Sequence, residues 1–244
     1  MSTEQLHEDA SYWTLRKYAR LRIIDVIPFA RTEMRAAFEA HALPFTEYTK
    51  LYTLGPVGVE LAKSRYDGTP LSGYLGYGLT RVMHDICVSE TVLQLAKFAS
   101  ERGWIPSWEG LNEATLYSAD GSRQLLEPDA MLLLEQKGKA PLRFLIEYHN
   151  EDHRTRAERK VDKYRNVCMI NSSRWQTAWE TDAFPPVLAV FRKKIVGYGY
   201  RDKLATLEAS PVCFYGKLFV GVLKNNLTEW MNFTTRQRES IWGE

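Results

Sequence analysis

The chain has 244 residues, of which 45% are hydrophobic and 25% charged, a composition that is ordinary for a globular protein of one or two domains. Its formal net charge is only +2, which excludes a globally basic nucleic-acid-binding protein and leaves a local patch for such a partner. The 3 cysteines are far apart and odd in number, which favours thiols in a reducing compartment over a disulfide framework. The N-terminus lacks a signal-peptide pattern, and no apolar run approaches the roughly 20 residues of a membrane span. We therefore expect a cytoplasmic protein with no membrane partner.

The first 66 residues predict a small helical module. Its predicted elements are helices over 11–27, 30–41 and 57–63 and a strand over 51–54. This order is compatible with a winged-helix DNA-binding module, and the alternative is a helical cap that packs on the main domain. Residues 67–79 gather glycines around Pro70, so we expect a linker and a domain boundary there.

Residues 80–244 are expected to form one mixed α/β domain. Apolar residues between Ile86 and Ala96 predict an amphipathic helix in the second half of the stretch from Thr80 to Arg102, with Gly103 placed as its C-terminal stop. The remaining predicted elements are strand-like segments over 104–111 and 114–120, strands over 130–134, 144–147, 185–191 and 217–223, a helix after His153, and a short helix over 203–209. Helices and strands that alternate in this way are typical of a mixed α/β fold.

Two acids at strand ends are the main candidate for chemistry. Asp129 opens the first strand of a predicted hairpin, and Glu147 ends the second. If the strands pair, the two carboxylates can share a hard divalent cation such as Mg²⁺, which polarises a phosphodiester bond. The alternative is structural: Asp129 belongs to a turn before the strand, and Glu147 is a solvated strand end.

The hairpin and its flanks resemble known families. Pro128-Asp129, a hairpin and an acid on the next strand are similar to the PD-(D/E)XK nuclease-like superfamily, with His149 where that superfamily carries a lysine. A closer resemblance is to the replication-relaxation family of plasmids and mobile elements, through Met83–Val88, Glu127–Ala130, Phe144–Glu147, Lys160–Tyr164 and Phe184–Leu188. The resemblance implies a PD-(D/E)XK restriction-endonuclease-like core, a mixed sheet flanked by helices, after an N-terminal helical module of the winged-helix type.

A lysine on the following helix can replace the missing one. Ala157, Val161, Tyr164 and Cys168 recur at helical spacing and form a stripe that faces the core. Lys160 flanks this stripe and could reach back to the carboxylates, whereas Lys163 points further toward solvent. The alternative is a surface lysine whose stem covers apolar area.

The same helix carries the densest cationic run of the chain. Its candidate phosphate contacts are Arg154, Arg156, Arg159 and Lys163, which would bind DNA in a salt-dependent way. Acids on the helix dilute this charge, so a solvated face with internal ion pairs is the alternative. His149 and His153 are four residues apart, a spacing that also permits a zinc site, although no third ligand is evident.

These observations and the resemblance predict a DNA-binding protein of a plasmid or mobile element with Mg²⁺- or Mn²⁺-dependent deoxyribonuclease activity. Asp129 and Glu147 would hold the metal, and Lys160 would stabilise the developing charge. The alternative, which His149 in the lysine position favours, is a catalytically inactive nuclease-like fold that binds DNA or a replication or transfer protein. A regulator that acts through the N-terminal helices alone is a third hypothesis, and a homodimer is considered for each.

Overall fold

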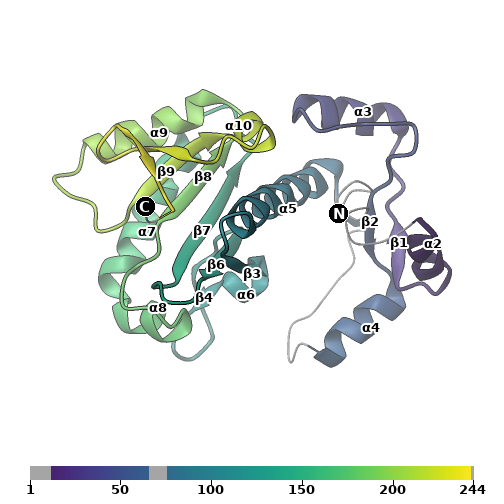
Figure 1. Cartoon of the computed structure of the whole chain (residues 1–244), viewed down its shortest axis with the longest axis horizontal. Helices are drawn as coiled ribbons and strands as arrows, with labels where there is room; N and C mark the ends of the chain where they lie inside the picture. Colours follow the sequence, from purple (N-terminus) through teal and green to yellow (C-terminus); the bar gives the residue numbers. More distant parts are fainter. Residues whose placement is uncertain (1–11, 66–75, 243–244) are drawn as a thin grey trace. The chain divides into compact units, whose positions relative to one another are not determined.

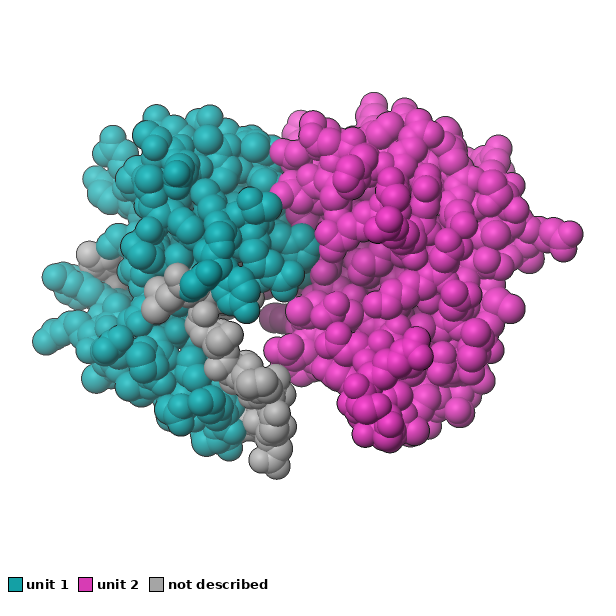
Figure 2. Space-filling view, turned by 180° about the vertical axis from the view of Figure 1, so that it is seen from behind, with its two compact units in different colours: residues 1–90 teal, residues 91–244 magenta. Residues whose placement is uncertain are grey.

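The computed structural model describes residues 12–65 and 76–242. The chain divides into two compact units, residues 1–90 and 91–244, which Figure 2 shows in different colours. The division falls inside helix α5 (Leu79–Ser100), so one continuous helix contributes to both units. Most of the linker predicted over 67–79 lies outside the described residues, and the domain boundary predicted there remains a sequence-based proposal.

The first unit combines short helices with a two-stranded sheet (Figure 1). Its elements before α5 are α2 (Tyr12–Arg20), β1 (Ile24–Val26), α3 (Arg31–Ala40), β2 (Tyr52–Leu54) and α4 (Pro56–Arg65). The helix predicted over 11–27 is wrong beyond Arg20, because Arg22 adopts a left-handed backbone conformation with φ 56°. The β-branched residues that follow favour an extended strand, which pairs antiparallel with β2.

The second unit is built on a seven-stranded mixed sheet with the order β11-β10-β9-β8-β7-β6-β3. Its strands are β3 (Ile105–Gly110), β6 (Ala130–Glu135), β7 (Leu142–His149), β8 (Val187–Phe191), β9 (Phe214–Leu218), β10 (Glu229–Asn232) and β11 (Arg238–Ser240). β7, β8 and β9 are parallel to one another, and the remaining pairs are antiparallel. β4 (Leu116–Tyr117) and β5 (Gln124–Leu126) form a separate pair. The predicted mixed α/β class is confirmed.

Helices cover both faces of this sheet (Figure 1). The other helices of the unit are α6 (Leu111–Ala114), α7 (Thr155–Ile170), α8 (Ser172–Ala178), α9 (Lys194–Ala205) and α10 (Phe219–Leu223). On one face, Tyr164 of α7 and Tyr200 of α9 both pack against the ring of Phe214 on β9. On the other face, Phe98 of α5 contacts Trp242, which in turn contacts Phe144 of β7. Among the described residues, no helix is long and apolar enough to cross a membrane.

One apolar run forms a different element from the one its sequence predicts. Residues 217–223 were predicted as a strand, but β9 ends at Leu218 and the run continues as helix α10. Residues 203–209 were predicted as a helix of their own, whereas Lys203 lies in the last turn of α9. A short, wholly apolar segment has no periodicity that separates a buried strand from a buried helix, so tertiary packing decides.

β7 is the central strand that positions the candidate site. It is longer than predicted and continues through Glu147 to His149, with β6 on one side and β8 on the other. Because side chains alternate along a strand, Glu147 and His149 point to the face covered by α7 and α9. Tyr148 points to the opposite face, where its ring packs against Phe219 of α10.

Candidate active site

The pairing of β6 and β7 places the two predicted acids opposite each other. Ala130 pairs with Ile146, and the backbone N–H of Asp129 extends the ladder by donating to the carbonyl of Ile146 at 3.0 Å. The N–H of Tyr148 then donates to Oδ2 of Asp129 at 2.7 Å. Asp129 is 9% exposed and Glu147 1% exposed. Glu147 is therefore a buried carboxylate within a strand, not a solvated strand end.

Lys160 and Tyr164 of α7 converge on Glu147. Both donate to Oε1 of Glu147, the ammonium Nζ at 2.7 Å and the phenol hydroxyl at 2.6 Å. They are four residues apart, one turn of the same helix face. Nζ of Lys160 also donates to the carbonyl of Glu127 at 3.3 Å, which ties α7 to the chain just before Asp129. The structure thus brings Asp129, Glu147 and Lys160 together.

His149 belongs to a second polar network on the same face. Its Nε2 lies 2.7 Å from the hydroxyl of Tyr200, and its Nδ1 lies 3.3 Å from Oε2 of Glu151. The other carboxylate oxygen of Glu151 forms an ion pair with Nη1 of Arg156 at 2.6 Å. The contact between Nε2 and Tyr200 is a hydrogen bond in which the tautomer of the ring decides which group donates. His149 thus makes structural contacts in the position where the superfamily has its lysine.

The charges of this cluster shift the pKa values of its members. Burial raises the pKa of Glu151, but the His149 ring and the charge of Arg156 outweigh burial and lower the pKa to about 2. Burial lowers the pKa of Arg156, but the charges of Glu151, Asp129 and Glu147 outweigh it and raise this pKa above its ordinary value. Both partners of the Glu151–Arg156 pair are charged at neutral pH, and each one shifts the pKa of the other toward its charged form.

The two buried tyrosines remain protonated. Burial, and then the negative charge of Glu147, raise the pKa of Tyr164 well above 10. The pKa of Tyr200 is raised for the same reasons, with a further contribution from Asp129. Tyr164 is therefore a fixed hydrogen-bond donor to Glu147, since a phenol with a raised pKa keeps its proton at neutral pH.

The acids offer oxygen ligands that fit a hard divalent cation. Oε2 of Glu147 is a buried acceptor that finds no hydrogen-bond partner among the described residues. Those residues also contain no group of three or more His, Cys, Asp or Glu side chains that could hold a metal. A cation at this place would rest on the carboxylates of Asp129 and Glu147 and complete its coordination with water or phosphate, as Mg²⁺ commonly does. The zinc alternative loses a ligand, because His149 is fully buried while His153 is exposed.

The four predicted DNA contacts divide into two pairs. Arg154 and Arg156 are engaged in ion pairs, with Asp202 at 2.7 Å and with Glu151 at 2.6 Å respectively. Arg159 and Lys163 are exposed on α7. The order Arg156, Arg159, Lys160, Lys163 follows the i, i+3, i+4, i+7 spacing of one helix face. We call these four residues the basic stripe; it runs from the carboxylates out to solvent.

Three groups of the site were missed in the sequence. Tyr164 was identified as a core residue of the α7 stripe, and its place one turn after Lys160 was the signal that its hydroxyl would share the same partner. Tyr200 lies on α9, more than fifty residues from His149, and nothing in the sequence connects the two. Glu151 has no local signal for its role either, because its partners His149 and Arg156 are brought to it by the loop after β7.

The sequence profile described as replication-relaxation matches residues 3–182, which is more than half of the chain. The chain belongs to the replication-relaxation family. Comparison with curated proteins and with solved structures gives no significant match. Membership of the replication-relaxation family indicates a role in the replication or relaxation of a mobile element.

The matched segment of this replication-relaxation protein contains Asp129, Glu147 and Lys160, together with β6, β7 and α7, which carry the site. Helix α9, with Tyr200, lies beyond the match, as do strands β8 to β11. The candidate site is therefore built mainly, but not entirely, from the part of the chain that defines the family.

Proposed function

We propose that this replication-relaxation protein binds DNA and cleaves a phosphodiester bond with the help of Mg²⁺ or Mn²⁺. The observation that carries the proposal is the ion pair between an ammonium and one of two facing carboxylates: Nζ of Lys160 is 2.7 Å from Glu147, which lies opposite Asp129 on the neighbouring strand. Two acids that can hold a divalent cation, with a lysine beside them to stabilise charge, are compatible with metal-assisted phosphodiester hydrolysis. His149 occupies the position of the superfamily's lysine, and Lys160 on the next helix supplies the positively charged side chain instead.

Each residue has a definite part in this proposal. Asp129 and Glu147 would hold the cation, which when bound polarises the phosphodiester and lowers the pKa of a water molecule. Lys160 stabilises negative charge that develops on the phosphate, because its ammonium is fixed by two oxygen acceptors. Tyr164 holds Glu147 in place with a donor that does not titrate near neutral pH.

The basic stripe provides the path for the DNA backbone. Two of its exposed members, Arg159 and Lys163, would contact phosphates on either side of the bond that lies at Lys160. Such contacts are independent of sequence, and each one that is removed should lower the salt slope of binding by about 1. Arg159→Ala and Lys163→Ala are expected to weaken binding of duplex DNA at low salt and to flatten its salt dependence. The helices of the first unit, as a module of the winged-helix type, are proposed as a second contact with DNA.

Plasmid cleavage tests the catalytic part. Supercoiled plasmid is incubated with Mg²⁺ or Mn²⁺ and the wild-type protein, Asp129→Asn, Glu147→Gln or Lys160→Met. We expect nicking by the wild type and a loss of at least about 100-fold in each variant. Glu135→Gln, at the exposed far end of β6, is the matched control and should cut normally. Equal nicking by the wild type and the Asp129 and Glu147 variants would refute the catalytic assignment.

A second function, DNA or protein binding without cleavage, is favoured by a specific observation. Glu147 is 1% exposed, and its Oε1 already accepts two hydrogen bonds, so the ion pair with Lys160 also serves as a structural connection between β7 and α7. If the protein only binds, neither the wild type nor any variant nicks the supercoiled plasmid, while Arg159→Ala still weakens DNA binding. Calorimetry with Mn²⁺ separates the two functions independently of cleavage, because only the first predicts binding that Asp129→Asn abolishes.

A further inference from the structure

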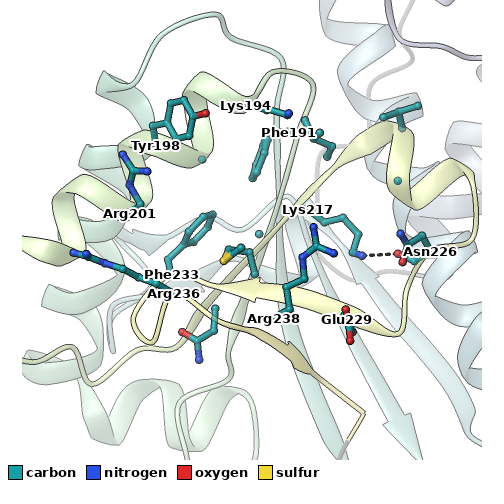
Figure 3. Close-up of a pocket in the computed structure, with 17 residues that line it drawn as sticks. Phe191, Lys194, Tyr198, Arg201, Lys217, Asn226, Glu229, Phe233, Arg236 and Arg238 are labelled. Atoms are coloured by element: carbon teal, nitrogen blue, oxygen red, sulfur yellow. Dashed lines mark hydrogen bonds between the residues drawn. The ribbon is translucent and has the colours of Figure 1, made fainter.

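A basic pocket lies in the second unit, in the part of the chain beyond the family match. It has a volume of about 420 Å³ and lies between α9, the end of β9, α10 and the β10–β11 hairpin. Figure 3 shows Lys194, Tyr198 and Arg201 on the helical side and Arg236 and Arg238 on the hairpin side. None of its lining residues falls within residues 3–182. The pocket is therefore distinct from the carboxylate site.

At the base of the pocket, the sheet packs closely against two aromatic rings at Gly216. A Cβ atom at this position would lie 2.1 Å from Cζ of Phe233 and 3.0 Å from Cε1 of Phe191, so only glycine lets the backbone pack on the two rings. Met231 pairs with Gly216 on one side and with Arg238 on the other, which places the three residues on one face of the sheet. Met231 is 36% exposed and gives the floor an apolar surface.

The charge of the pocket is strongly positive, although the protein as a whole is nearly neutral. Its lining contains five cationic side chains and a single acid, Glu229. Arg201 is compensated by Asp202, with which it forms an ion pair at 2.7 Å. The ion pairs found among the described residues do not involve Lys194, Arg236 or Arg238.

The cations of the pocket also oppose one another. Burial and then the positive charge of Arg238 lower the pKa of Lys217, and Glu229 offsets only part of this effect. The ammonium of Lys217 is held by the carbonyl of Asn226, a neutral acceptor (Figure 3). An anion in the pocket would relieve this repulsion, since it adds the negative charge that the lining lacks.

We propose that this pocket binds a nucleotide, free or at the end of a DNA strand. Its phosphate would contact Lys194 and Arg238, Arg236 would add positive charge at the rim of the pocket, and its base would lie over the apolar floor at Met231. Arginine forks match phosphate oxygens, and apolar or aromatic surfaces accept the face of a base. A pocket of this volume also exceeds what an isolated phosphate fills and is in the range of small-molecule sites, roughly 300–1,000 Å³. The proposal stands on the pocket residues and does not rest on the proposed cleavage centre.

Calorimetry with the full chain and dTMP tests the site. We expect wild-type binding, a loss of affinity of at least about tenfold in the double variant Arg236→Ala/Arg238→Ala, and unchanged affinity in Arg123→Ala. Arg123 is an exposed arginine at the β4–β5 turn and serves as the matched control. Asp129→Asn should also bind dTMP normally, which separates this site from the carboxylate site. Thermal melting followed by circular dichroism shows whether the double variant is folded.

Two further probes identify the source of the nucleotide. A dT₁₀ oligonucleotide with a 5′-phosphate and one with a 5′-hydroxyl are compared by fluorescence polarisation. If dTMP binds as tightly as the phosphorylated strand, the natural ligand is a free nucleotide. If the phosphorylated strand binds more tightly than dTMP and the 5′-hydroxyl strand, the ligand is a strand end. Inorganic phosphate that binds as tightly as dTMP, affinities that the double variant leaves unchanged, or failure of the wild type to bind dTMP and the phosphorylated strand would each overturn the proposal.

Discussion

Replacement of Lys160 by methionine tests the ion pair on which the site is built. Methionine keeps much of the apolar stem of lysine and removes only the ammonium, so the packing of α7 on the sheet changes little. The variant leaves Glu147 at 1% exposure with its Oε1 bonded to Tyr164 alone. A buried carboxylate that loses its counter-ion is expected to destabilise the folded state.

The size of the effect follows from the burial of the pair. Removal of one partner of a buried ion pair costs about 3–5 kcal/mol. The side chain of Lys160 is 14% exposed, and the hydrogen bond from Tyr164 persists, so we expect the lower end of this range, about 3 kcal/mol. The double variant Lys160→Met/Glu147→Gln removes the buried charge as well and should recover at least about 1.5 kcal/mol of that loss.

Urea denaturation followed by tryptophan fluorescence measures these free energies of unfolding. All tryptophans except Trp13 lie in the second unit, so the signal reports on the unit that contains the site. Lys163→Met, an exposed position three residues along the same helix, is the matched control and should stay within about 0.5 kcal/mol of the wild type. A loss below about 1 kcal/mol for Lys160→Met, or a double variant no more stable than the single one, would refute the reasoning.

Three further variants test other features of the fold. Tyr164→Phe removes the 2.6 Å hydrogen bond to buried Glu147 and should lower the free energy of unfolding by about 2 kcal/mol in the same urea assay. The pKa of Glu151 is lowered from 4.5 to about 2. Its contribution to the free energy of unfolding is therefore present above pH 4.5 and is lost as the pH falls toward 2. Glu151→Gln should remove on the order of 2 kcal/mol of this stability, which would appear as a flatter plot of melting temperature against pH. Gly216→Ala places a methyl group against the ring of Phe233 and should cost about 3 kcal/mol, measured by thermal melting, whereas an unchanged melting temperature would contradict the packing of the pocket floor.

The central hairpin and the helix after it could be predicted because their signals are local. Pro128-Asp129, the apolar run of β6, the turn with Gly138 at φ 80° and the stripe on α7 each specify one element without reference to the rest of the chain. The same stripe placed Lys160 beside the core, from where it reaches Glu147. Local periodicity was thus sufficient for the elements that carry the acids and the lysine.

The rest of the site depends on long-range contacts. Tyr200 meets His149 only because β8 and α9 return the chain to the same face of β7, and no pattern near His149 announces that contact. Arg156 was identified by its charge as a DNA contact, but the partner that holds it, Glu151, comes from the loop after β7. Pairing between a cation and an acid on different elements is decided by topology, which the composition of a single helix does not contain.

The family match ends at residue 182, just before β8, and the pairing of the sheet makes that position a poor place to cut the chain. β8 forms five register pairs with β7, from Leu145–Val187 to His149–Phe191, and all of its residues are buried. A recombinant fragment truncated at residue 182 would leave one side of β7 as an open, apolar edge, which invites pairing between fragments and precipitation. The C-terminal strands are therefore part of the same cooperative folding unit as the family segment, and recombinant protein made for biochemistry should retain them.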